Sequence, residues 1–299
     1  MRVFVTGASG FIGSAVVPNL IAAGHRVLGL ARSDASAKAL AAAGAEVHRG
    51  DLNDVESLRV GAAETEGVIH LGFIHDFNNF EASVRTDLRA IETIGKALEG
   101  TGRPFVLASG VLGMAPGRLL TEEFPYDPKM HPRMANAVVA LGMAQRGVRV
   151  SFVRLSPTVH GPHDHGFIAT IAGIAREKGV SGYIGDGSNR WNAVNVLDAA
   201  PLFRLALEKA TPGAILHAVG DEAVPTRQIA EIIGRKLGLP VASIAPEAAG
   251  AHFGWMGRFF AFDQPASSAL TQKLMGWKPT HPSLIADLEA GYYTDPVQH

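Results

Sequence analysis

Three glycines near the N-terminus have the spacing of a phosphate-binding turn. Gly7, Gly10 and Gly13 follow a short β-type run and open a helical pattern. In that context the first glycine permits a tight turn, the second lets the backbone approach a pyrophosphate, and the third lets the helix pack closely on the strand. The N–H groups at the start of the helix then face the phosphates. The other predicted phosphate contacts in this turn are Ser9, Phe11 and Ile12.

The end of the second predicted strand decides which dinucleotide fits. A carboxylate there bonds the ribose 2′-hydroxyl of NAD, whereas an arginine accepts the 2′-phosphate of NADP. Here the strand ends in Ala31-Arg32-Ser33, and both Arg32 and Ser33 can donate to a phosphate. The sequence therefore favours NADP(H). NAD(H) stays open, because Arg32 can equally be a solvated loop residue while Asp34 caps the next helix or folds back.

The segment 160–165 contains the types of residue that bind zinc. Three histidines and one aspartate lie within residues 160–165. A loop rich in proline and glycine does not fix their directions as a helix would, so no metal site is predicted. His165 is instead expected to line a substrate pocket, and Trp191 is expected there as well.

The elements that must position these residues alternate between strand and helix. Such alternation predicts a doubly wound α/β fold with a parallel sheet, joined by right-handed crossovers. The predicted strands are residues 2–6, 25–30, 46–48, 67–71, 104–109 and 148–155. The predicted helices are residues 11–23, 35–43, 54–60, 77–98 and 132–146.

The sequence pattern changes after residue 155, and we therefore predict two domains. Residues 1–155 form the dinucleotide-binding domain. Residues 156–299 form mainly a smaller substrate-binding lobe, with some segments returning to the first sheet. Residues 157–166 and 182–192 are expected as connections, and 198–209 as a helix capped by Asp198. An aromatic group at residues 255–262 is expected to pack in a core or, as the alternative, to cover a pocket.

Composition excludes several classes of function. The 299 residues include 27 Lys plus Arg and 28 Asp plus Glu, so no charge bias favours nucleic acid or an acidic membrane. Cysteine is absent, which excludes disulfides, cysteine-ligated metals and a thiol nucleophile. A cytoplasmic location is expected from this reducing-compartment composition. No apolar run is long enough to span a bilayer.

Several linked motifs resemble the extended short-chain dehydrogenase/reductase family, named for NAD-dependent epimerases and dehydratases. The Gly-x-x-Gly-x-x-Gly turn has that family's form, and the similarity continues along nearly the whole chain. It implies that Ser109, in Leu107-Ala108-Ser109-Gly110, is the active-site serine. It also implies a substrate-domain signature at residues 185–198, which includes Arg190. The cofactor contacts implied by the resemblance are Asp51, Leu52, Leu71, Gly72, Phe73, Pro157, Thr158 and Val159.

The family's proton-donating pair is missing. A tyrosine normally donates a proton, and a lysine four residues later lowers its pKa. None of the four tyrosines, at positions 126, 183, 292 and 293, has lysine four residues further on. By register, Arg133 stands where the tyrosine should be and Ala137 where the lysine should be. This departure resembles the atypical subgroups of the family.

The remaining candidates for the chemistry are therefore assigned by residue type. Ser109 is expected to hold a carbonyl, and His75 beside Asp76 is expected to act as a tuned imidazole, although it can also be a surface histidine. Arg133 can polarise an oxygen or bind an anionic substrate, but it does not release a proton near neutral pH. Tyr126 lies in an irregular loop from which it can reach a pocket.

The sequence thus predicts an NADP-dependent oxidoreductase for a small carbonyl or alcohol substrate, with a non-standard proton donor. A non-catalytic NADP(H)-binding redox sensor and an epimerase or dehydratase remain alternatives. The expected partner is a small molecule, and a homodimer is what the resemblance implies.

Overall fold

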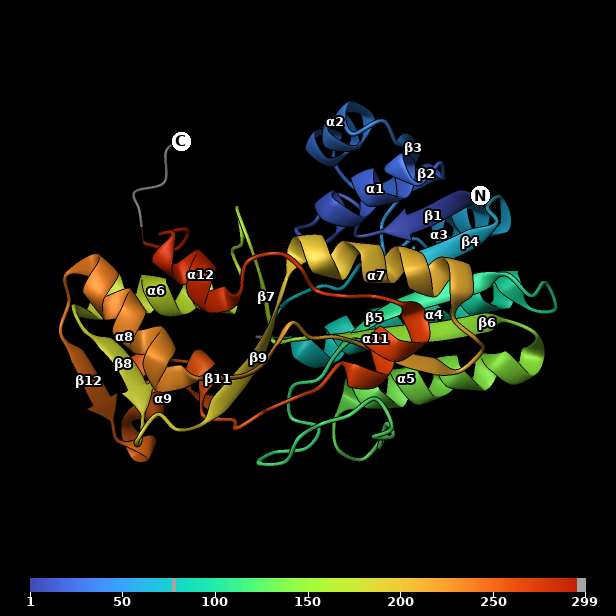
Figure 1. The fold of residues 1–299 in the computed structure, drawn as a ribbon. Coiled ribbons are helices and arrows are strands. Elements are labelled where there is room, and N and C mark those ends of the chain that lie inside the picture. Colours follow the sequence, from blue (N-terminus) through green and yellow to red (C-terminus); the bar gives the residue numbers. More distant parts are fainter. Residues whose placement is uncertain (77–78, 295–299) are drawn as a thin grey trace.

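A seven-stranded parallel sheet forms the first lobe of the computed structural model, which describes residues 1–76 and 79–294 (Figure 1). The strand order β10-β6-β5-β4-β1-β2-β3 starts the chain in the middle and winds it outward in both directions. The predicted doubly wound class is confirmed. The strands are β1 (Arg2–Thr6), β2 (Arg26–Ala31), β3 (Glu46–Arg49), β4 (Gly67–His70), β5 (Pro104–Gly110), β6 (Arg149–Leu155) and β10 (Ala214–Ala218).

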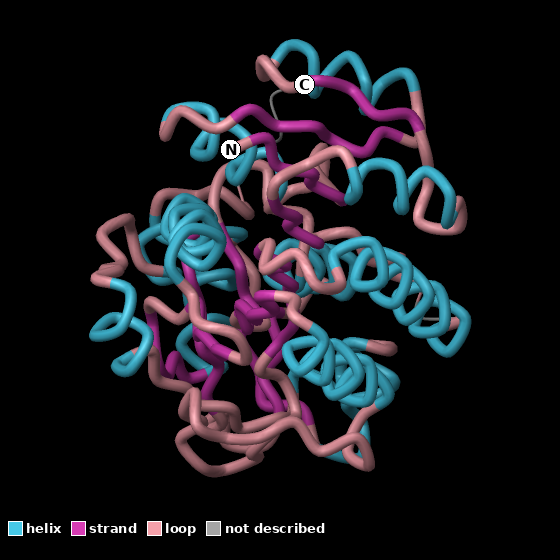
Figure 2. Tube along the Cα trace, turned by 90° about the vertical axis from the view of Figure 1, so that its right-hand side faces the viewer, coloured by secondary structure: helices cyan, strands magenta, loops and turns pink. Residues whose placement is uncertain are grey.

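Helices cover both faces of this sheet (Figure 2). The alternation in β1 shows why, since Val3 and Val5 belong to one hydrophobic cluster and Phe4 to the other. One face carries α1 (Gly13–Ala22), α2 (Asp34–Ala42) and α7 (Val196–Lys209). The opposite face carries α3 (Val55–Ala63), α4 (Phe80–Leu98) and α5 (Pro132–Gly142), which continues as the 3₁₀ turn η1 (Met143–Arg146). None of the helices described is long and apolar enough to cross a membrane.

The second lobe holds two small sheets and a core of its own. Strands β11 (Asp221–Pro225), β9 (Arg190–Asn195) and β7 (Thr158–His160) form one sheet, and β12 (Val241–Ile244) pairs with β8 (Ser181–Ile184). Around them lie α6 (Phe167–Lys178), α8 (Thr226–Leu237), η2 (Pro246–Ala248), α9 (Ala249–Phe253), α10 (Met256–Phe260) and α12 (Leu284–Glu289). The chain returns to the first lobe through α7 and β10, and again through α11 (Ala269–Met275). The boundary at residue 155 stays a prediction.

Two expectations about local structure are wrong, and a third falls partly outside the described residues. The segments 157–166 and 182–192, expected as connections, contain β7, the end of β8 and the start of β9. Helix α7 is capped by Asn195, whose side chain accepts from Leu197 N at 3.0 Å, and not by Asp198. The predicted start of a helix at residue 77 lies outside the described residues, and α4 begins at Phe80.

Asp198 instead fixes the segment that joins α11 to α12. Its carboxylate accepts from the backbone N–H groups of Thr280 and His281, at 2.9 and 3.0 Å, and bonds the His281 ring at 2.7 Å. Its backbone carbonyl accepts from Trp277 Nε1 at 2.9 Å. Since Asp198 is 4% exposed, removal of its carboxylate takes a buried acceptor from two backbone N–H groups and from the His281 ring.

We therefore expect Asp198→Ala to lower the free energy of unfolding by about 3 kcal/mol, because buried charge-assisted hydrogen bonds are lost. Urea denaturation measures the change. Asp186→Ala, at an exposed turn, is the matched control and should change stability little. An equal loss in both variants would contradict this assignment.

Candidate active site

The glycine turn is held tightly against the neighbouring strand. Gly7 has a φ of +66°, and a Cβ added to it would lie 2.7 Å from Gly72 N, which follows β4. A Cβ on Gly13 would lie 2.2 Å from Gly7 O, so neither position admits a side chain without movement. Gly10 N donates to Gly7 O at 3.0 Å and closes the turn.

The same turn presents a helix N-terminus. Helix α1 begins after Ile12 with no side-chain cap, and Ser9 and Gly10 are exposed. The uncapped N–H groups and the positive end of the helix dipole favour an anion at this place. A turn that leaves no room for side chains, in front of an uncapped helix, fits the pyrophosphate of a dinucleotide.

Residues after β3 and β4 lie beside this turn. A Cβ on Gly72 would lie 3.1 Å from Leu52 Cδ2 and 3.3 Å from Gly7 N. Leu71 N donates to Thr6 O at 3.2 Å. Asp51 accepts from the backbone and side-chain N–H groups of Asn53. The structure thus brings Leu52, Leu71 and Gly72 to the turn.

The end of β2 presents a basic surface. Arg32 and Ser33 are exposed, and Ser33 caps α2 by accepting from Ser36 N at 3.1 Å. The alternative in which Asp34 caps this helix is therefore wrong. Asp34 instead pairs with Arg49 of β3 at 2.5 Å.

Ser109 lies one residue before the end of β5 and contacts a tyrosine. The Ser109 Oγ and Tyr126 OH atoms lie 2.5 Å apart. Tyr126 is 9% exposed, and the Arg154 guanidinium of β6 lies 4.0 Å from its ring centre. Burial raises the pKa of Tyr126, and the Arg154 charge opposes part of that rise. Tyr126 therefore keeps its proton at neutral pH.

A buried polar chain, which we did not predict, runs from the glycine turn towards α5. Thr6 Oγ1 accepts from Gly72 N at 3.1 Å and bonds His70 Nδ1 at 2.7 Å. His70 Nε2 lies 3.4 Å from Asp87, whose other oxygen accepts from Asn136 at 2.8 Å. Burial opposes ionisation of Asp87, but the hydrogen bond from His70 and the charge of Arg133 outweigh it and lower its pKa. The only signal in the sequence was that Asp87 and Asn136 fall on apolar helix faces.

Arg133 is in the same small pocket as Ser109, His70 and Asp87. Its guanidinium lies 4.0 Å from the ring centre of Phe73, and the His75 ring is 5.1 Å from that of Phe73. Burial and then the Arg133 charge lower the pKa of His75. His75 is therefore mainly neutral near pH 7, which does not support its expected role as an acid.

The remaining residues that were predicted for the site do not share one location in the structure. His165 lies at the phosphate turn, where its ring makes an edge contact with Phe11 at 6.0 Å. Val159 packs against the core of the first lobe and Thr158 is buried, whereas Pro157 is half-buried. Trp191 is fully buried, so the structure places it in the core and not on a pocket wall.

The histidine-rich segment is divided among separate contacts. His160 bonds Asp287 at 2.6 Å, and Tyr293 donates to Asp164 at 2.8 Å. Among the residues described, no three His, Asp or Glu side chains come together as metal ligands.

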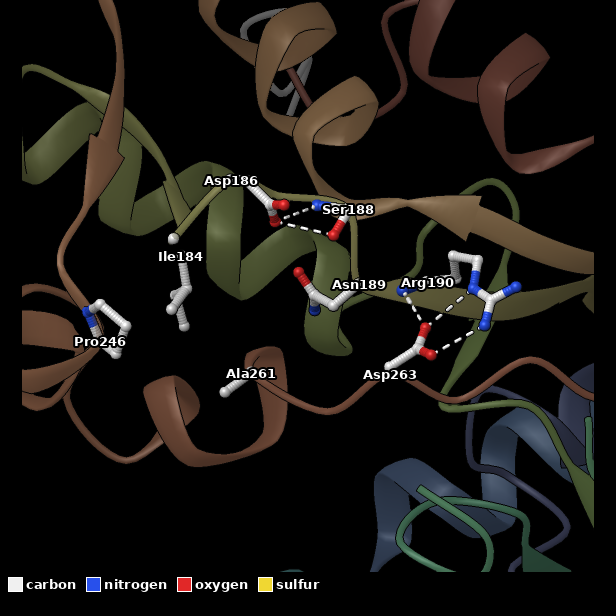
Figure 3. Close-up of a pocket in the computed structure, with 9 residues that line it drawn as sticks. Ile184, Asp186, Ser188, Asn189, Arg190, Pro246, Ala261 and Asp263 are labelled. Atoms are coloured by element: carbon white, nitrogen blue, oxygen red, sulfur yellow. Dashed lines mark hydrogen bonds and ion pairs between the residues drawn. The ribbon is translucent and has the colours of Figure 1, made fainter. Parts of the chain in front are cut away.

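A separate cavity of about 630 Å³ lies in the second lobe (Figure 3). Arg190 and Asp263 form a two-pronged ion pair at its wall, with distances of 2.9 and 2.8 Å. None of its lining residues belongs to the pocket at Ser109. The carboxylate of Asp263 therefore already neutralises the positive charge of Arg190.

The sheet and the glycine turn at its centre define an enzyme of the extended short-chain dehydrogenase/reductase type, dependent on a nicotinamide dinucleotide. The model of the NAD dependent epimerase/dehydratase family matches residues 3–218. The chain therefore belongs to that family, and the predicted resemblance is confirmed.

Relatives and a solved structure agree with this assignment. An uncharacterised protein of Schizosaccharomyces pombe is 48% identical over 98% of this chain and 100% of its own length. A 3-diazoavenalumate denitrifying reductase of a Streptomyces species is 30% identical, over 95% of this chain and 97% of its own. The Thermus thermophilus UDP-glucose 4-epimerase, solved in complex with NAD, superimposes with a TM-score of 0.75 at 22% identity, covering 98% of each chain.

We predict that Gly13→Ala weakens NADPH binding at least about tenfold, because the new methyl group displaces the Gly7 carbonyl. Fluorescence of bound NADPH measures the affinity. Gly173→Ala, in α6 where an added Cβ meets nothing within 4 Å, should leave the affinity unchanged. Unaltered binding by Gly13→Ala would show that the cofactor does not use this turn.

Proposed function

We propose that the protein is an NADP(H)-dependent reductase of small carbonyl compounds. The observation that carries this proposal is the Ser109–Tyr126 hydroxyl pair, 2.5 Å apart at the end of β5. The bound nicotinamide would supply the hydride. Ser109 would hold the substrate oxygen by a hydrogen bond, which fixes the carbonyl in one orientation and supports the developing negative charge.

The basic surface at the end of β2 supports NADP(H) over NAD(H). Arg32 is exposed at that strand end, and no ion pair of Arg32 is found among the described residues. A ribose 2′-phosphate would gain charge-assisted hydrogen bonds from Arg32 and from the Ser33 hydroxyl. The Arg49 charge already neutralises Asp34, which removes the carboxylate most able to favour NAD.

Aromatic and basic groups near Arg133, which shares a pocket with Ser109, support an aromatic substrate that carries an anionic group. Phe73 stacks with Arg133, and Phe80 lies 5.4 Å from the His131 ring. Burial and then the Arg133 charge lower the pKa of His131, and the Arg258 charge of the second lobe adds to this effect. A relative named as a reductase, at 30% identity, agrees with reduction as the reaction.

Two other functions remain as candidates. The missing Tyr-x-x-x-Lys pair favours a non-catalytic redox sensor that binds NADP(H). An epimerase or dehydratase would act on a nucleotide sugar, but the ion pair between Arg190 and Asp263 occupies the cation that would meet its diphosphate. A homodimer and a cytoplasmic location also stay proposals.

For the cofactor, we expect Arg32→Ala to weaken NADPH binding roughly tenfold to a hundredfold and to leave NADH binding unchanged, because one charge-assisted contact to the 2′-phosphate is lost. Fluorescence titration with both dinucleotides measures this. Arg26→Ala, at the opposite end of the same strand, is the control. Equal losses for NADPH and NADH would contradict the assignment.

For the reaction, we expect NADPH oxidation with aromatic ketones and aldehydes, and faster oxidation with those that bear a carboxylate. Ser109→Ala should lower kcat roughly a hundredfold, because the orienting hydrogen bond is lost, while NADPH still binds. Absorbance of NADPH follows turnover across matched pairs of neutral and carboxylate-bearing compounds.

Each function predicts a different outcome of that panel. Tight NADPH binding without turnover of any carbonyl would favour the sensor. Conversion of a nucleotide sugar without net change in cofactor would favour the epimerase. Unchanged turnover by Ser109→Ala would exclude Ser109 from the reaction.

A further inference from the structure

Arg154 is a buried cation that its neighbours do not neutralise. The residue is 0% exposed in β6, and in the described part of the chain it forms no ion pair. Its Nη1 donates to His217 Nε2 at 3.5 Å, while Nε and Nη2 have no hydrogen-bond partner among the described atoms. A buried charge is costly unless an opposite charge compensates it, so this position favours an anion nearby.

His217 does not supply that anion. Its Nδ1 bonds Ser267 O at 2.8 Å, which leaves Nε2 to accept from Arg154. Burial lowers the pKa of His217 to about 4, so the ring is neutral at physiological pH. Glu122 is buried as well, and its Oε1 accepts from Thr271 N and Oγ1, both at 2.7 Å, but within the described part of the chain no hydrogen bond or ion pair joins it to Arg154.

Tyr126 is the ionisable group in direct contact with Arg154. The guanidinium carbon lies 4.0 Å from the centre of the Tyr126 ring, and Arg133 adds a second positive charge that acts on the same hydroxyl. That hydroxyl is 2.5 Å from Ser109 Oγ. The arrangement gives Tyr126 a route for its proton on one side and a cation to stabilise the resulting tyrosinate on the other.

We propose that Tyr126 is the proton source that replaces the missing tyrosine, with Ser109 as the relay and Arg154 in place of the missing lysine. This inference rests on the proposed reductase function. When the carbonyl carbon is reduced by NADPH, its oxygen needs one proton. The Ser109 hydroxyl gives that proton and takes one from Tyr126, and solvent then reprotonates the Tyr126 oxygen. One O–H bond forms for each that breaks.

Tyr126 occupies a different position in the chain from the tyrosine of the family's motif. Tyr126 lies in the loop before α5, whereas the motif would place a tyrosine at Arg133 inside that helix. The two positions converge on Ser109, because Arg133 and Ser109 line the same pocket and Tyr126 bonds Ser109. His75 is the weaker candidate, since it is mainly neutral and burial disfavours its protonation.

The test compares Tyr126→Phe with Tyr183→Phe. The second variant is a matched control, because Tyr183 also lies under an arginine, Arg227, at 5.4 Å, but in the other lobe. Tyr126→Phe should lower kcat roughly 10²- to 10⁴-fold, the usual contribution of a positioned acid. It should leave the NADPH dissociation constant unchanged, and Tyr183→Phe should keep the wild-type rate. A wild-type rate in Tyr126→Phe would overturn the proposal but leave the reductase function intact.

A double-mutant cycle separates a relay from a structural role. If both hydroxyls belong to one proton path, Ser109→Ala combined with Tyr126→Phe should be no slower than the slower single variant. Losses that multiply would mean independent roles and would overturn the relay. Absence of turnover in the wild-type protein would instead refute the proposed function, and the proposal with it.

A spectroscopic titration tests the role of Arg154 without turnover. The tyrosinate absorbance of Tyr126 is the difference between the wild-type protein and Tyr126→Phe. Arg154→Gln removes the cation, so the tyrosinate absorbance should appear at a higher pH than in the wild-type protein, because a positive charge stabilises tyrosinate. Arg154→Lys keeps the charge and should restore most of the shift. An unchanged titration in Arg154→Gln would exclude Arg154 from this role.

Discussion

The close approach of the backbone at Gly7 and Gly72 is the constraint on which the rest of the site depends. β1 and β4 are neighbours at the centre of the sheet, where the chain reverses the direction in which it adds strands. Gly7 and Gly72, which follow these strands, meet without side chains between them, and this leaves the helix N-terminus open to a pyrophosphate. Any side chain at Gly7 would separate the two strand ends.

That contact is extended by hydrogen bonds towards the pocket at Ser109. Thr6 accepts from Gly72 N and bonds His70, and the chain continues through Asp87 to Asn136. These groups are buried, so their polar atoms depend on one another for hydrogen bonds. The network therefore ties the phosphate turn to α4 and α5, and so to the pocket that Ser109 shares with Arg133.

The parts of this site that obey local rules could be predicted from the sequence. Glycine spacing identified the turn, and the alternation of Val3, Phe4 and Val5 follows the doubly wound sheet. Strands β7 and β9 were missed in part, because the glycine and proline residues that flank them are typical of loops and only pairing within the second lobe makes them strands. The buried position of Trp191 depends on contacts with Phe167 and Phe260, which lie far from it in sequence. The contact of Tyr126 with Ser109 and Arg154 likewise depends on the course of an irregular loop. An irregular loop has no periodic sequence pattern from which that course could be predicted.

The central claim is that hydride moves between NADPH and a carbonyl carbon held at Ser109. The most direct measurement uses NADPH deuterated at the transferring position of its nicotinamide, and mass spectrometry of the alcohol formed from an aromatic keto acid. The account predicts one deuterium in the product from the wild-type protein and little product from Ser109→Ala. A product without deuterium, or bound NADPH with no product at all, would contradict it.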